Sequence, residues 1–197
     1  MRINATTRVL HYCLIMTVVF QLLSSEFMRV LEPGKMEGFD TVLFTLHIMI
    51  FGWGAFLISS VYILILHDDK DAWARMVPWF SASHRAALFK SVRKDIFAMF
   101  QGCLPHPEEK GAIAGVTHGL GILLLLAQGF TGAYVMFGVR SDGTMRTDTL
   151  LVLDFHAIFA KLLWIFLIGH ICMFIIHLMF GHREILDVFR RVHIPWK

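Results

Sequence analysis

Four long apolar stretches alternate with polar segments along the chain, over about residues 9–31, 41–66, 113–137 and 150–180. A bilayer core of ~30 Å requires about 20 helical residues, and each stretch is long enough to meet that requirement. The helix of the first stretch is expected to begin about one turn before its apolar run. The pattern predicts an all-α integral membrane protein, a bundle of four transmembrane helices forming a single domain over residues 1–197.

The polar segment between the second and third stretches holds a pattern of its own. From residue 83 to residue 100, apolar side chains recur at roughly helical spacing, and basic side chains stand between them: Arg85, Lys90, Arg93 and Lys94. A basic amphipathic helix of this kind lies on a membrane surface, with its apolar face among the lipids. We therefore expect a surface helix between the second and third spans.

Lysine and arginine are unevenly distributed among the polar segments. They gather at the N-terminus, between the second and third stretches, and in the C-terminal tail, whereas the other two loops hold only Lys35, Arg140 and Arg146. With four spans, the three basic segments fall on one side of the membrane. Basic loops stay in the cytoplasm, so both termini are expected there and the protein is expected to be multi-pass.

Composition narrows the class of cofactor. The chain is 56% hydrophobic, with 18 Phe and 11 Met, which suit lipid contact, ordinary core packing or packing around a flat apolar cofactor. Three cysteines (Cys13, Cys103 and Cys172) form no C-x-x-C pair. A covalent c-type haem, an iron–sulfur cluster or a structural zinc within this chain is therefore not expected. Nothing indicates a nucleic-acid partner.

The fourth stretch carries three histidines, His156, His170 and His177. An imidazole is costly to bury in lipid, so an intramembrane histidine indicates function. His156 and His170 are 14 residues apart, which places them within roughly 40° of each other and about 21 Å apart along one helix. On this helix alone, ligation of two stacked haems and hydrogen bonding to neighbouring helices both remain open.

The depths of four histidines match in pairs. His47 and His156 each lie about six residues into a helix from the non-cytoplasmic side, roughly 9 Å deep, whereas His11 and His170 lie roughly 30 Å from that side. Pairing His47 with His156 and His11 with His170 would hold two b-type haems. Ligation by two imidazoles leaves no position for O₂ and favours electron transfer. The alternative, a haem-free transporter that relays protons, predicts unpaired depths and carboxylates within the spans.

The spacing of these residues resembles a known superfamily over nearly the whole chain. The features that carry the resemblance are Arg8-x-x-His11, His47 early in the second helix, Thr131-Gly132 in the third, and His156 and His170 in the fourth. They are similar to the membrane cytochrome b subunits of respiratory formate dehydrogenases, the cytochrome b subunits of nickel–iron hydrogenases, and bacterial cytochrome b561.

The resemblance implies an electron-transfer subunit of an oxidoreductase complex rather than a complete enzyme. In the bacterial inner membrane it would take electrons from an iron–sulfur subunit and a periplasmic catalytic subunit, and reduce a quinone (menaquinone or ubiquinone) near the cytoplasmic haem. Quinol-oxidising members work in reverse. The alternative is a stand-alone cytochrome b561-like quinone oxidoreductase, for example one that oxidises superoxide.

Three further residues are candidates near the inner haem. His118 lies near the cytoplasmic end of the third helix, where it would bind quinone, cap the helix or contact a haem propionate. His177 lies seven residues beyond His170 on the same face; a propionate, a quinone and the interface are equally open partners. Arg8 is expected to pair with a propionate or to serve only as a positive-inside residue.

Overall fold

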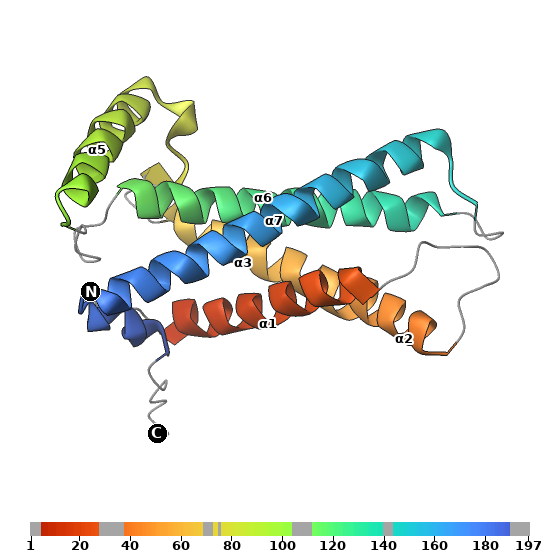
Figure 1. The fold of residues 1–197 in the computed structure, drawn as a ribbon. Helices are drawn as coiled ribbons and strands as arrows, with labels where there is room; N and C mark the ends of the chain where they lie inside the picture. Colours follow the sequence, from red (N-terminus) through yellow and green to blue (C-terminus); the bar gives the residue numbers. More distant parts are fainter. Residues whose placement is uncertain are drawn as a thin grey trace. The chain divides into compact units, whose positions relative to one another are not determined.

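The computed structural model of the chain describes residues 5–27, 38–68, 73–74, 76–103, 112–139 and 144–189 (Figure 1). Within these ranges, the structure is helical apart from short turns and one isolated β-bridge between Val139 and Met145. The described residues include four helical stretches long and apolar enough to cross a membrane: Ala5–Phe27, Thr41–Ile65, Ile113–Gly138 and Thr147–Met179. The predicted all-α membrane fold with four spans is confirmed.

The described ranges hold the following helices in chain order. They are α1 (Ala5–Phe27), α2 (Phe39–Thr45), η1 (Leu46–Gly52), α3 (Trp53–Asp68), η2 (Pro78–Phe80), α5 (Ala82–Phe100), α6 (Ala112–Gly138), α7 (Thr147–Met179) and η4 (Arg183–Phe189). The first helix begins at Ala5, about one turn before residue 9 as expected, and predicted residues 28–31 lie outside the described ranges. The fourth begins three residues before predicted position 150.

The second span differs from the prediction of one continuous α-helix. Its middle, η1, is a π-helix, and the backbone N–H of Trp53 bonds to the carbonyl of Ile48, five residues back. A π-helical turn inserts one residue into the helical repeat and often marks a functional site. Here it contains the buried side chain of His47.

The predicted amphipathic segment is the helix α5. Ser81 caps its N-terminus, since the Ser81 hydroxyl accepts a hydrogen bond from the backbone N–H of His84. At its other end Gly102 has φ 74°, a left-handed conformation that lets Cys103 N–H bond back to Ala98 O at 2.9 Å. Large apolar side chains along α5 are exposed: Phe89, Ile96, Phe97, Met99 and Phe100. The helix is confirmed, and its place on a membrane surface stays a prediction.

The chain divides into two compact units. The first comprises Met1–His11, Tyr62–Ile122 and Leu167–Lys197, and the second comprises Tyr12–Val61 and Leu123–Phe166. Each predicted histidine pair falls within one unit: His11 and His170 in the first, His47 and His156 in the second. The prediction of a single domain stays a prediction.

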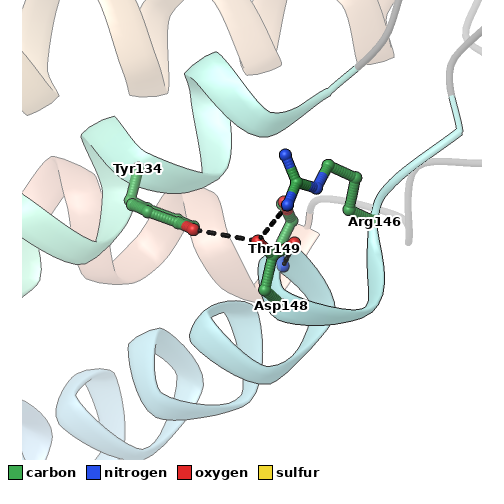
Figure 2. Close-up of polar contacts among 4 residues, drawn as sticks. All are labelled: Tyr134, Arg146, Asp148 and Thr149. Atoms are coloured by element: carbon green, nitrogen blue, oxygen red, sulfur yellow. Dashed lines mark hydrogen bonds and ion pairs between the residues drawn. The ribbon is translucent and has the colours of Figure 1, made fainter.

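In the second unit, a cluster of polar contacts fixes the start of α7 against α6 (Figure 2). The Asp148 carboxylate accepts a hydrogen bond from the Tyr134 hydroxyl at 3.3 Å and forms an ion pair with Arg146 at 3.0 Å. It also accepts from the backbone N–H of Thr149 at 2.9 Å. An acidic side chain in the first turn suits the positive end of the helix dipole. Together these contacts define where α7 begins.

Gly138 lets α6 and α7 approach closely at this corner. A Cβ added to Gly138 would overlap the side chain of Thr149, which is itself only 1% exposed. Any larger residue at position 138 would therefore push the two helices apart. This contact sets the register of α6 against α7 for the turns that follow.

Candidate functional site

His47 is held by α1 at two points. Its imidazole Nδ1 lies 2.7 Å from the Ser24 hydroxyl, and its backbone carbonyl accepts a hydrogen bond from the Gln21 side-chain amide. His47 and Ser24 are 8% and 3% exposed. Gly52 leaves space for this arrangement, because a Cβ there would lie 3.3 Å from Gln21 Nε2 and 2.9 Å from the His47 carbonyl oxygen. The π-helical turn thus presents the His47 carbonyl to α1.

His156 lies on α7, and its imidazole contacts three residues of α6. Its Nδ1 is 2.9 Å from the Thr131 hydroxyl, and its Nε2 is 3.1 Å from the Gln128 side-chain nitrogen. A Cβ on Gly132 would lie 3.1 Å from the ring carbon Cε1. The absence of a side chain at Gly132 therefore gives the imidazole its space.

The register of the α6–α7 pair explains why Thr131 meets His156. Gly138 contacts Thr149 at the corner. Thr131 lies seven residues before Gly138, and His156 lies seven residues after Thr149. Seven residues are about two helical turns, so two antiparallel helices in contact at the corner meet again at the Thr131–His156 level.

Further aromatic contacts pack the second unit around this level. Phe20 of α1 stacks on Phe51 of η1, with ring centres 3.8 Å apart. Phe56 of α3 meets Phe130 of α6 edge-on at 5.0 Å. Such ring pairs add about 0.5–1.5 kcal/mol each beyond their buried area, so the span that carries His47 is tied to α1 through one pair and to α6 through the other.

The first unit brings together three imidazoles. The rings of His11 on α1 and His170 on α7 have their centres 6.4 Å apart, and the ring of His118 on α6 stands perpendicular to that of His170 at 5.0 Å. The His118 Nδ1–H donates to the backbone carbonyl of Ala114 at 2.6 Å. His118 therefore directs its other nitrogen, Nε2, away from its own helix.

The donor set suits a haem iron. Two imidazole nitrogens, each ~2.0 Å from a metal, place their ring centres roughly 6 Å apart, and the His11–His170 spacing of 6.4 Å agrees with this value. His47 and His156 lie in the same compact unit, the first buried and the second half-buried. Beside them, Gln128 Oε1 is buried and has no hydrogen-bond partner within the part of the chain that the structure describes. An orphaned polar atom of this kind next to a histidine pair fits a site built for a further group.

Arg8 and His177 are the two remaining candidates from the sequence, and the structure shows where each lies. Arg8 is half-buried on α1, one turn before His11. At the end of α7, Gly181 has φ 84° and His182 N–H bonds back to His177 O at 3.0 Å, which turns the chain toward the helix. As a result the Nδ1 atoms of His177 and His182 lie 2.9 Å apart. Contact with a propionate stays a prediction for Arg8, and contact with a propionate or a quinone stays a prediction for His177.

Three residues at the second-unit site were not singled out from the sequence: Gln21, Ser24 and Gln128. A signal for them existed, because a polar side chain inside an apolar span is costly in lipid and turns toward the protein interior. The sequence does not reveal which imidazole each one meets.

Comparisons with known proteins yield one informative match. No match is found among curated proteins or among solved structures. A family model described as prokaryotic cytochrome b561 matches residues 2–190. The match covers nearly the whole chain and confirms the resemblance drawn from its histidines. The chain therefore belongs to the prokaryotic cytochrome b561 family, and it is a multi-pass membrane cytochrome b that binds haem b and carries electrons.

Proposed function

We propose that the chain binds two haem b groups, one between His47 and His156 and one between His11 and His170, and carries electrons between a partner oxidoreductase and the quinone pool. The ring spacing of 6.4 Å between His11 and His170 is the observation that carries this proposal. The placement of His47 and His156 in the same compact unit supports it.

The chain's own residues position the ligands and exclude water. Haem b held by two imidazoles supplies one-electron transfer, since no coordination position is left for O₂. Ser24 and Thr131 orient the imidazoles of His47 and His156 through their Nδ1 atoms. Buried apolar side chains such as Leu22 and Leu163, each 2% exposed, fill the helix interfaces.

Haem content of single variants tests the ligand assignment. His47→Ala, His156→Ala, His11→Ala and His170→Ala should each reduce the purified protein from two haems to one. His84→Ala, on the exposed face of α5, should retain both and serves as the control. Haem per chain is measured by the pyridine haemochrome method, together with a reduced-minus-oxidised spectrum. Retention of both haems in all four variants would refute the ligand assignment, and a wild-type protein without a b-type α-band would favour a haem-free transporter instead.

We further propose that the quinone site includes His118. Its ring lies against His170, and its Nδ1–H is already committed to Ala114 O, so Nε2 can accept a hydrogen bond from a quinol hydroxyl. His118→Gln should abolish haem reduction by a quinol analogue, while dithionite still reduces both haems. Equal quinol reduction in the variant and the wild type would exclude this role.

The partners and the orientation also belong to this proposal. Basic segments support cytoplasmic termini and a bacterial inner-membrane location. An anchor subunit should co-purify from gently solubilised membranes with an iron–sulfur subunit and a periplasmic catalytic subunit. The match to prokaryotic cytochrome b561 favours, as a second candidate, a stand-alone quinone oxidoreductase such as a superoxide oxidase. Isolation of the chain alone, with superoxide-dependent quinone reduction, would decide for that candidate.

A further inference from the structure

Both imidazoles of the second-unit pair are contacted at the same ring atom by a hydroxyl from a neighbouring helix. The Ser24 hydroxyl on α1 lies 2.7 Å from His47 Nδ1, and the Thr131 hydroxyl on α6 lies 2.9 Å from His156 Nδ1. The two contacts come from different helices and different residue types. Their agreement on Nδ1 therefore arises independently at each imidazole.

Each hydroxyl has an acceptor for its proton on its own helix. Thr131 Oγ1–H donates to the backbone carbonyl of Ala127 at 2.7 Å, and Ser24 Oγ–H donates to the carbonyl of Gln21 at 3.1 Å. A hydroxyl has one proton and two lone pairs. When that proton goes to the helix carbonyl, the oxygen accepts toward the imidazole, and the histidine proton lies on Nδ1.

The second nitrogen of His156 gives an independent check. Gln128 Nε2 lies 3.1 Å from His156 Nε2, and a side-chain amide nitrogen only donates. With the amide nitrogen of Gln128 toward the ring, His156 Nε2 carries the lone pair, which is the same tautomer that an accepting Thr131 hydroxyl favours. That lone pair is the one a metal would take, so ligation would displace the Gln128 amide.

We propose that Ser24 and Thr131 are positioning residues that fix His47 and His156 in the Nδ1–H tautomer, direct Nε2 to the haem iron and lower the reduction potential of that haem. The inference rests on the proposed ligation by His47 and His156. A hydrogen bond accepted from Nδ1–H makes the imidazole a more basic ligand, and a more basic ligand favours the oxidised iron. Loss of the hydroxyl should therefore raise the potential.

The expected rise in reduction potential can be estimated from the usual effect of removing a hydrogen-bond partner of a metal ligand. Outer-shell variants lose about 10- to 100-fold in metal binding. A tenfold weaker preference for the oxidised iron corresponds to a rise of about 59 mV for a one-electron couple. Ser24 is only 3% exposed, so water cannot easily replace its hydroxyl.

The test uses the purified full-length protein with its haems and an optical redox titration. Thr131→Val and Ser24→Ala remove each hydroxyl, and Thr131→Ser and Ser24→Thr restore it. Thr117→Val is the matched control on α6, because the Thr117 hydroxyl bonds only to the carbonyl of Ile113 among the contacts described, at 2.8 Å. Ser59→Ala is the control for Ser24, since Ser59 is also buried and bonds to its own helix.

We expect Thr131→Val and Ser24→Ala to retain the fold and to raise one of the two midpoint potentials by about 59 mV or more. Thr131→Ser and Ser24→Thr should restore the wild-type value. If a hydroxyl-free variant loses one haem instead, recovery of that haem in the hydroxyl-restoring variant supports the same role. Unchanged potentials with both haems present, an equal shift in Thr117→Val, or haem loss that Thr131→Ser does not reverse would overturn the inference.

The histidine variants separate this inference from the proposed function. If His156→Ala retains both haems, the ligand assignment itself is wrong. If His156→Ala loses one haem while Thr131→Val shifts nothing, the ligands stand and only the positioning role fails.

Discussion

Replacement of Gly132 tests most directly how the imidazole of His156, a proposed haem ligand, is packed. A Cβ at this position would lie 3.1 Å from His156 Cε1, 3.6 Å from Nδ1 and 3.9 Å from Nε2. Since ordinary contacts begin at 3.4 Å, the ring must retreat by a few tenths of an ångström in Gly132→Ala. A leucine side chain would instead occupy the space of the ring itself.

Two opposing terms set the stability of Gly132→Ala. Alanine is favoured over glycine within a helix by about 1 kcal/mol, whereas overpacking costs about 1–3 kcal/mol. The net loss is therefore about 0–2 kcal/mol, so the protein should still fold. Functional geometry is less tolerant, because ligands must be held to within about 0.5 Å.

If the proposed ligation is correct, Gly132→Ala should retain two haems with one altered midpoint potential, and Gly132→Leu should lose the haem proposed to lie between His47 and His156. Haem per chain, redox titration and thermal unfolding in detergent measure these outcomes. Gly169→Ala and Gly169→Leu are the controls, because a Cβ there would meet nothing within 4 Å. Two haems with wild-type potentials in Gly132→Leu would refute the packing reasoning, as would equal haem loss in Gly169→Leu.

Three other predictions concern stability. Gly138→Ala should lower the unfolding temperature by separating α6 from α7, since the new Cβ overlaps Thr149; an unchanged temperature and haem content would contradict the register described above. Leu163→Ala should cost about 2–5 kcal/mol, because Leu163 is 2% exposed, whereas the 42% exposed Leu162 should tolerate the same change in a parallel thermal scan. Asp148→Asn removes an exposed ion pair and should cause only a small loss of stability that salt reduces further; a large, salt-independent loss would argue against this.

The sequence alone determined the architecture, because bilayer thickness imposes a length on every apolar helix. It predicted the four spans and the amphipathic helix α5, and the structure confirms these helices. It also predicted the superfamily, since Arg8, Thr131-Gly132 and the histidine spacing lie at fixed positions along the chain. The family match over residues 2–190 confirms that prediction.

The π-helical turn was decided only by tertiary structure. The apolar pattern of the second span predicts a continuous helix, because one extra residue in the repeat leaves no mark in an all-apolar run. The turn is accompanied by the contact of the Gln21 amide with the His47 carbonyl, and that contact depends on α1. Hydrophobic periodicity predicts which side chains are buried, but it does not predict hydrogen bonds between helices.

The contacts at the imidazoles were likewise decided by packing. Ser24 and Gln128 are recognisable in the sequence as polar residues within apolar spans, but their partners depend on the rotation and register of neighbouring helices. The Gly138–Thr149 contact sets that register, and it places Thr131 beside His156. A linear pattern fixes the depth of a side chain along its own helix, whereas its neighbour across the interface is fixed only when the helices pack.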